Sequence, residues 1–215
     1  MSLRLTVTMA FALLVPISGM ALAETAAPTD APAQSAEPPA KLGPLELTKT
    51  SAAKVLADIR ENRARYESDS EALYAMVNER ILELFDFRTM SLLVLGPNWK
   101  SASDEQKSRF VDGFRNLLVR TYSKALLQAG DAEIDWEPLD LAEGDTRTMV
   151  SGSVATNSGP VTIHWRLRER PEGWRVYDVV VDGISLVTNY RGSYSSEIRK
   201  IGLDGLIEKL EQRAG

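Results

Sequence analysis

The first half of the chain repeats its hydrophobic residues every three or four positions, the period of an amphipathic helix. This pattern predicts a polar helix over 48–66, a second helix over 69–85, and a short apolar helix that stops at Gly96, where Pro97 blocks any continuation. Ser103 and Gln106 form a capping box. The helix that they open is predicted to carry one wide apolar face up to Gly130.

The hydrophobic period changes near residue 132. Four stretches, 132–141, 147–156, 160–170 and 173–181, alternate or run apolar, with turn residues between them. They predict a four-stranded antiparallel meander with hairpin connections. Because the helical period returns beyond Gly183, we expect an α+β fold: a small curved antiparallel sheet of about four strands packed against several helices.

Apolar strand residues would face the space between the sheet and the helices. They fill a dry core or line a cavity, and apolar periodicity alone favours a core. The strand residues in question are Val150, Val154, Ile163, Trp165, Tyr177, Val179 and Val181.

The N-terminal segment has the three parts of a secretory signal peptide: Arg4, an apolar stretch over 5–17, and the small-residue site Ala21–Ala23. The apolar stretch is too short for a bilayer, which needs about 20 residues. We therefore expect a Sec-type signal peptide over 1–23, cleaved after Ala23, and a disordered Ala/Pro-rich linker over 24–47. One domain remains over 48–215, with a helical part (48–130), a sheet (132–182) and C-terminal helices (185–213).

Charge and cysteine content narrow the function classes. The net charge is −5, and an acidic chain without basic runs argues against nucleic acid and against tight docking on anionic membranes. The sequence contains no cysteine, which excludes disulfides, thiol catalysis and cysteine–zinc sites. Export without cysteine fits a bacterial periplasm better than an animal extracellular space.

Reactive motifs are incomplete throughout the sequence. The single histidine, His164, lies within a strand pattern, and one histidine excludes a multi-histidine metal site. Ser51–Lys54 has the S-x-x-K spacing without its companion motifs, and Gly183–Ser185 is half of a nucleophile elbow. A carboxylate such as Asp178 in an apolar pocket could act as an acid or base, so an enzyme stays an alternative. We expect no enzyme, metal or cofactor.

Two groups of motifs appear in a characteristic order and spacing. The first group is Phe85-Asp86-Phe87, Leu95-Gly96 with Trp99, then Gln106 and Phe110; the second is Trp174–Asp178, Gly183–Ser185, Asn189–Arg191 and Gly202–Leu206. Together they resemble the MlaC, or toluene-tolerance, family of periplasmic phospholipid-transport proteins of the Mla system. The resemblance covers nearly all of residues 48–210.

The resemblance implies a soluble periplasmic carrier that holds a phospholipid as cargo by its acyl tails in an apolar cavity. It would shuttle lipid between the outer-membrane Mla lipoprotein–porin complex and the inner-membrane Mla ABC transporter complex, and so maintain outer-membrane lipid asymmetry. The lipid-binding residues would be the seven strand residues above and, from the helices, Leu84, Phe85, Met90, Leu93, Val94, Leu186 and Val187.

Arg88 or Arg191 would meet the phosphate of the headgroup, or would form a structural salt bridge. We expect a monomer with no nucleic-acid partner. The alternatives are an enzyme on a cone-shaped α+β fold, or a non-lipid binding module with a solid core.

Overall fold

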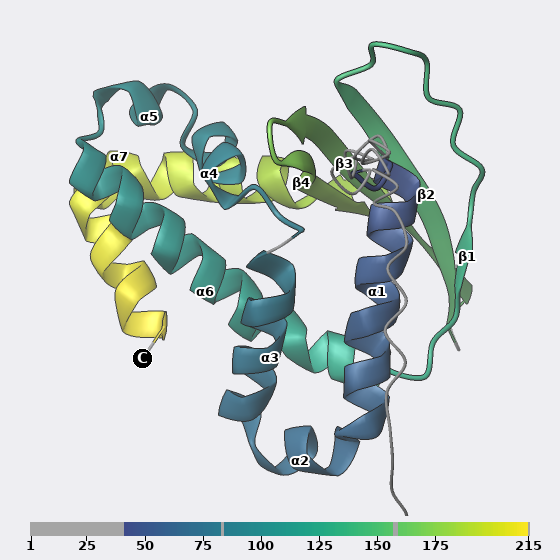
Figure 1. Ribbon diagram of the computed structural model, residues 1–215. Coiled ribbons are helices and arrows are strands. Elements are labelled where there is room, and N and C mark those ends of the chain that lie inside the picture. Colours follow the sequence, from purple (N-terminus) through teal and green to yellow (C-terminus); the bar gives the residue numbers. More distant parts are fainter. Residues whose placement is uncertain (1–40, 83, 157–158, 215) are drawn as a thin grey trace, which may run out of the picture. The chain divides into compact units, whose positions relative to one another are not determined.

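A computed structural model describes residues 41–82, 84–156 and 159–214 (Figure 1). The predicted signal peptide and most of the predicted linker lie outside these residues. The helices are α1 (Pro44–Glu61), α2 (Arg63–Ser68), α3 (Ser70–Leu82), α4 (Phe87–Leu95), α5 (Pro97–Ser101), α6 (Asp104–Gln128) and α7 (Leu186–Ala214). The strands are β1 (Ile134–Trp136), β2 (Arg147–Thr156), β3 (Gly159–Arg170), β4 (Gly173–Val181) and β5 (Ile184–Ser185).

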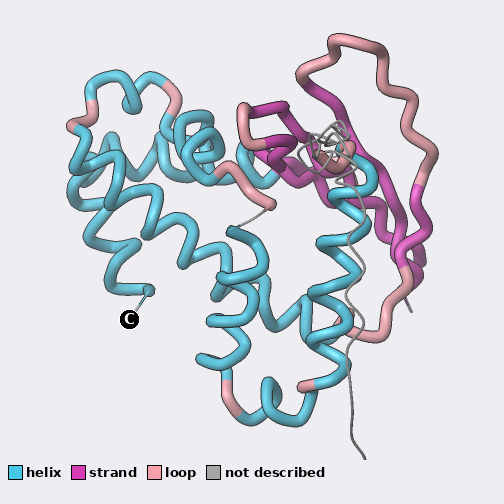
Figure 2. Tube along the Cα trace, in the orientation of Figure 1, coloured by secondary structure: helices cyan, strands magenta, loops and turns pink. Residues whose placement is uncertain are grey.

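The α+β fold class is confirmed (Figure 2). The five strands form one antiparallel sheet in the order β1-β2-β3-β4-β5. The sheet has one strand more than predicted, because Ile184 and Ser185 fold back onto the end of β4. Asp182 and Gly183 make this tight turn with φ values of 48° and 81°, the left-handed pair that a two-residue hairpin requires.

Several helix boundaries differ from the prediction. The helix predicted over 69–85 ends at Leu82, and Phe85 forms a β-bridge with Val176 of β4 instead. The first helix begins at Pro44, inside the predicted linker, because proline suits the first helical position and Leu45 and Leu47 pack against an apolar cluster. The predicted helix over 48–66 is divided at Asn62, whose side-chain amide donates to Asp58 Oδ1 at 3.0 Å.

The region around Gly96 is also different. Gly96 ends α4, as predicted, with a φ of 54°, and Pro97 begins the short helix α5, which was not predicted. The capping box at Ser103 is confirmed. The Ser103 hydroxyl accepts from the backbone N–H of Gln106 at 3.1 Å, and the Gln106 side chain accepts from the Ser103 N–H at 2.9 Å.

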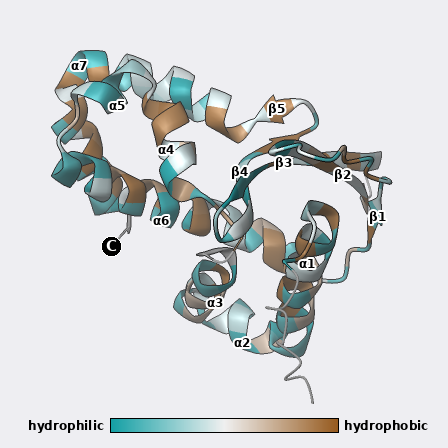
Figure 3. Cartoon of the chain, turned by 45° about the horizontal axis from the view of Figure 1, so that its top comes forward, coloured by the Kyte–Doolittle hydropathy of each residue, from teal (hydrophilic) through white to brown (hydrophobic). Residues whose placement is uncertain are grey.

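The sheet curves around α1, which lies on its concave side (Figure 3). We call this side the inner face. Trp165 is paired with Val150 and with Val179, and Ile163 with Val181, so these side chains share the inner face. The register between β3 and β4 shifts at a bulge, because Arg166 is paired with Asp178 but Leu167 with Val176. Tyr177 is the additional residue of β4. Val176 and Val179 therefore both lie on the inner face.

Three apolar clusters hold the described domain together. The largest joins α4, α6 and α7 around Phe110 and Phe114, which are fully buried. A second joins α1, α3 and α6 around Ile59 and Leu73. The third fills one end of the inner face around Leu167. Because α6 belongs to the first two clusters, it is the element that connects the helical layers.

None of the helices in the described ranges is both long enough and apolar enough to cross a membrane.

Candidate functional site

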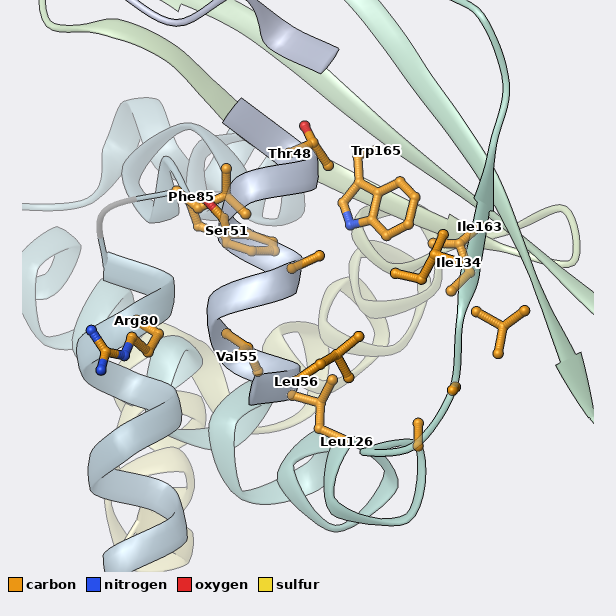
Figure 4. A pocket seen from close by; sticks show the side chains of 15 residues that line it. Thr48, Ser51, Val55, Leu56, Arg80, Phe85, Leu126, Ile134, Ile163 and Trp165 are labelled. Atoms are coloured by element: carbon orange, nitrogen blue, oxygen red, sulfur yellow. The ribbon is translucent and has the colours of Figure 1, made fainter. Parts of the chain in front are cut away.

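A cavity of about 210 Å³ lies between α1 and the inner face of the sheet (Figure 4). We call it cavity 1. In Figure 4, Leu56 and Leu126 lie next to each other at one end, and Trp165 and Ile163 form the sheet side. The residues that line it are Thr48, Ser51, Ala52, Val55, Leu56, Arg80, Leu84, Phe85, Leu126, Ala129, Ala132, Ile134, Val154, Ile163 and Trp165.

A second cavity, of about 240 Å³, lies between the helices and the end of the sheet that leads into β5. We call it cavity 2. Its lining is almost entirely aliphatic and aromatic, and its polar side-chain groups are the Tyr122 hydroxyl and the Trp165 indole N–H. The residues are Val77, Phe85, Phe87, Met90, Leu118, Val119, Tyr122, Leu126, Ile163, Trp165, Val179, Val181 and Leu186.

Four residues, Phe85, Leu126, Ile163 and Trp165, line both cavities. The ring centroids of Trp165 and Trp136 are 5.0 Å apart, and those of the stacked Phe85 and Phe87 rings are 5.7 Å apart. The two cavities therefore lie side by side and share a wall of four apolar residues.

Several polar groups of the lining are held by the protein itself. The Thr48 hydroxyl donates to the carbonyl of Pro44 at 2.7 Å. Burial, together with the neighbouring Tyr190, raises the pKa of Tyr122 to about 12, so its phenol is neutral. Arg80 is paired with Asp58 at 3.1 Å, and Asp58 is an anion whose pKa is lowered chiefly by the Tyr66 hydroxyl. The cavities are thus suited to an apolar guest rather than to a charged substrate.

Asp178 lies on the other face of the sheet, which we call the outer face, because it is paired with Arg166 rather than with Trp165. Its side chain is buried and accepts from Arg166 Nη1 at 3.1 Å, from the Ser185 hydroxyl at 2.7 Å and from the Val187 N–H at 3.1 Å. These bonds fix the corner between β5 and α7. Asp178 therefore does not line either apolar cavity, and the hypothesis of an enzyme that uses it there as an acid or base is not supported.

Asp86 fixes the other end of the site, where the chain passes from the cavity wall into α4. Its carboxylate accepts from the N–H and the hydroxyl of Thr89, at 2.8 and 2.6 Å, and from Arg170 Nε at 2.8 Å. Burial raises the pKa of Asp86, but the bonds from Thr89 and Arg170 outweigh it and lower the pKa below its usual value. Because Asp86 is ionised and anchored, its neighbours Phe85 and Phe87 are held in the lining.

Nine of the fourteen predicted lipid-binding residues line one or both cavities. They are Leu84, Phe85, Met90, Val154, Ile163, Trp165, Val179, Val181 and Leu186. The other five line neither cavity. Leu93, Val94 and Val187 pack in the helical cluster, Val150 is in the cluster at the end of the inner face, and Tyr177 is the bulge residue. Periodicity could not separate these groups, because cavity wall and solid core use the same apolar side chains.

Sequence reasoning missed the contribution of α1 and α6. Val55 and Leu56 belong to the thin apolar stripe of an otherwise polar helix, and Leu118, Tyr122 and Leu126 to the wide apolar face of α6. Each stripe was visible in the sequence. What it faces depends on how the sheet curves, which the sequence pattern does not specify.

The two candidate phosphate-binding arginines line neither cavity. Arg88 lies over the ring of Trp99 at 5.4 Å, and the Arg191 guanidinium lies against Gly96. Their contact with a headgroup stays a prediction.

Metal or histidine chemistry finds no support in the ranges that the structure describes. No group of three or more His, Asp or Glu residues there is arranged to hold a metal ion. His164 lies on the outer face, where its Nδ1 is 2.8 Å from the hydroxyl of Ser151.

The fold and the cavities define an α+β domain that encloses apolar space between a curved sheet and its helices. The family model for the MlaC protein matches residues 49–212, so the chain belongs to the MlaC family and the resemblance is confirmed. The chain is 27% identical over 179 residues to the "Intermembrane phospholipid transport system binding protein MlaC" of Haemophilus influenzae, covering 81% of this chain and 84% of the relative. It is 25% identical over 163 residues to the "Toluene tolerance protein ttg2D" of Pseudomonas putida, with 75% of each covered.

One solved structure similar to this fold is the phospholipid-binding protein from Ralstonia solanacearum, determined in complex with a phospholipid. The two chains are 30% identical with a TM-score of 0.73, and the match covers 79% of this chain and 96% of the other.

Proposed function

We propose that this protein is a periplasmic carrier that holds a phospholipid by its acyl tails in cavities 1 and 2. The observation that carries the proposal is the pair of adjacent apolar cavities with a common wall of four residues. The names of its relatives, which refer to phospholipid transport or binding, support the same cargo.

The energetics favour such a carrier. Burying a methylene is worth about 0.8 kcal/mol relative to water, so about ten buried methylenes of tail contribute about 8 kcal/mol against release into solution. Transfer from a bilayer into the cavities exchanges one apolar medium for another and is nearly neutral. The protein therefore needs no reaction of its own, and the direction of transport is set by its partners.

In this proposal the partners are the inner-membrane Mla ABC transporter complex and the outer-membrane Mla lipoprotein–porin complex. The protein carries lipid between them and so maintains the asymmetry of the outer membrane. An N-terminal signal peptide cleaved after Ala23 would deliver it to the periplasm as a monomer. The lipid-binding residues of the proposal are the residues that line the two cavities.

The proposal is tested by native mass spectrometry of the mature protein purified from a bacterial periplasm. We expect a mass increment of one or more phospholipids, and the same lipid in an organic extract. Protein that is empty as purified, and that stays empty after incubation with liposomes, would contradict the proposal.

A further inference from the structure

The outer face of the sheet carries a row of three arginines. Arg147 of β2 is paired directly with Arg168 of β3, and Arg168 is paired with Arg175 of β4. Neighbouring strands are about 4.8 Å apart. Like charges that lie opposite each other in a sheet are destabilising, so this row needs a source of negative charge.

In the described part of the chain Asp86 and Glu172 line the same surface pocket as Arg175, but no carboxylate forms an ion pair with the row. Two other arginines of the outer face have carboxylate partners, Arg166 with Asp178 at 3.1 Å and Arg170 with Asp86 at 2.5 Å. Both carboxylates are largely buried and also accept from other donors. They are therefore not available to the row.

The contacts of the three arginines themselves are weak or neutral. Arg168 Nη1 is 3.5 Å from the Thr89 hydroxyl, and its Nε is buried without a hydrogen-bond partner. Arg175 donates to the carbonyl of Trp174 at 2.8 Å. Within the described ranges, none of the three is in an ion pair with a carboxylate.

The row is partly accessible from solvent and lies beside an apolar residue. Arg147 is exposed, Arg168 and Arg175 are half-buried, and the neighbouring Met149 is 45% exposed. Positive charge is therefore concentrated on one face of a chain whose net charge is −5. The cavities open on the inner face, so this surface is not occupied by the lining of the proposed lipid site.

We propose that the arginine row is a docking surface for a protein partner that presents a line of carboxylates. Acidic side chains three or four residues apart on a helix are about 5–6 Å apart, which matches the spacing of the row. Guanidinium groups bind carboxylates through two parallel hydrogen bonds, and Met149 adds apolar contact. An anionic membrane fits less well, because the net negative charge of the chain repels it.

This inference rests on the proposed function in one respect: the partner is one of the complexes that deliver or receive the lipid. The two can fail separately, because lipid occupancy is measured on the isolated protein and docking on the complex.

The test is the double substitution Arg147→Glu/Arg175→Glu. Association with the purified inner-membrane and outer-membrane Mla complexes in nanodiscs is measured by biolayer interferometry at low and high salt. The matched control is Arg65→Glu/Arg199→Glu, which makes the same charge change at exposed positions on α2 and α7. Lipid occupancy of each variant is measured in parallel by native mass spectrometry.

We expect the row variant to associate with one complex at least about tenfold more slowly at low salt, with a weaker salt dependence, while the control binds as the unaltered protein does. Lipid occupancy should stay the same in both. Unchanged association of the row variant with both complexes, or no association of the unaltered protein, overturns the proposal. Loss of binding only to vesicles of anionic phospholipid overturns the choice of a protein partner.

Discussion

Ile163 offers the sharpest perturbation of the proposed lipid site, because it lines both cavities from the sheet. In Ile163→Trp the larger ring extends into open space, since cavities of about 210 and 240 Å³ lie on either side. If the ring keeps about four methylenes of tail from being buried, the bound lipid loses about 3 kcal/mol. We therefore expect the partition of lipid from bilayer to protein to fall about two-hundredfold.

The assay incubates the mature protein with liposomes that contain a phospholipid with a fluorescent tail, and measures the fraction bound after separation. Circular dichroism and thermal unfolding establish that the variant is folded. Leu92→Trp is the control, because Leu92 is 42% exposed on α4 and lines neither cavity. A folded Ile163→Trp protein that loads as well as the control would refute the assignment of the cavities to the tails.

Three further predictions concern the cavity wall, the anchors and the packing. Val181→Glu should lower lipid occupancy in a folded protein, because Val181 lines cavity 2. Val150→Glu should prevent folding, because Val150 is 1% exposed in a solid cluster and the new charge would be buried without a partner. Lipid extraction measures the first effect and circular dichroism the second. The pKa of Asp86 is lowered in the folded protein from its usual value of 3.8, so the ionised carboxylate stabilises the fold above that pH, and this stability is lost as pH falls through the folded pKa. Asp86→Asn lacks this contribution. Its free energy of unfolding in urea should therefore fall less from about pH 6 to about pH 3 than that of the unaltered protein. Gly130→Ala should cost about 1–3 kcal/mol in urea unfolding, because its Cβ would lie 2.4 Å from Ile59 Cγ2; an unchanged midpoint would show that the contact relaxes freely.

Much of the fold was predictable from local patterns. The strand bounds of β2 and β4 agree with the alternating stretches, and the capping box at Ser103 marks the start of α6. These features are local, because a strand period or a cap depends on a few adjacent residues. The two-residue strand β5 was not predicted, since its pairing depends on the Asp182–Gly183 turn rather than on a hydrophobic period.

The site was predictable only in part, for a different physical reason. Val150 and Val179 both flank Trp165 on the inner face, yet Val179 lines cavity 2 and Val150 lies in solid packing. Strand alternation places both residues on the same face and does not specify what packs over each of them. Tyr177 shows a second limit, because the bulge beside it breaks the alternation from which its side was inferred.

The central claim is that acyl tails occupy cavities 1 and 2, and photo-crosslinking tests it most directly. The mature protein is loaded with a phospholipid whose tail carries a diazirine, irradiated, digested and analysed by mass spectrometry. We predict adducts on the peptides that contain Leu126, Ile163 to Trp165 and Val179 to Val181, which line the two cavities. Bound lipid whose adducts fall only on exposed positions such as Leu92, Met149 or Ile184 would contradict it.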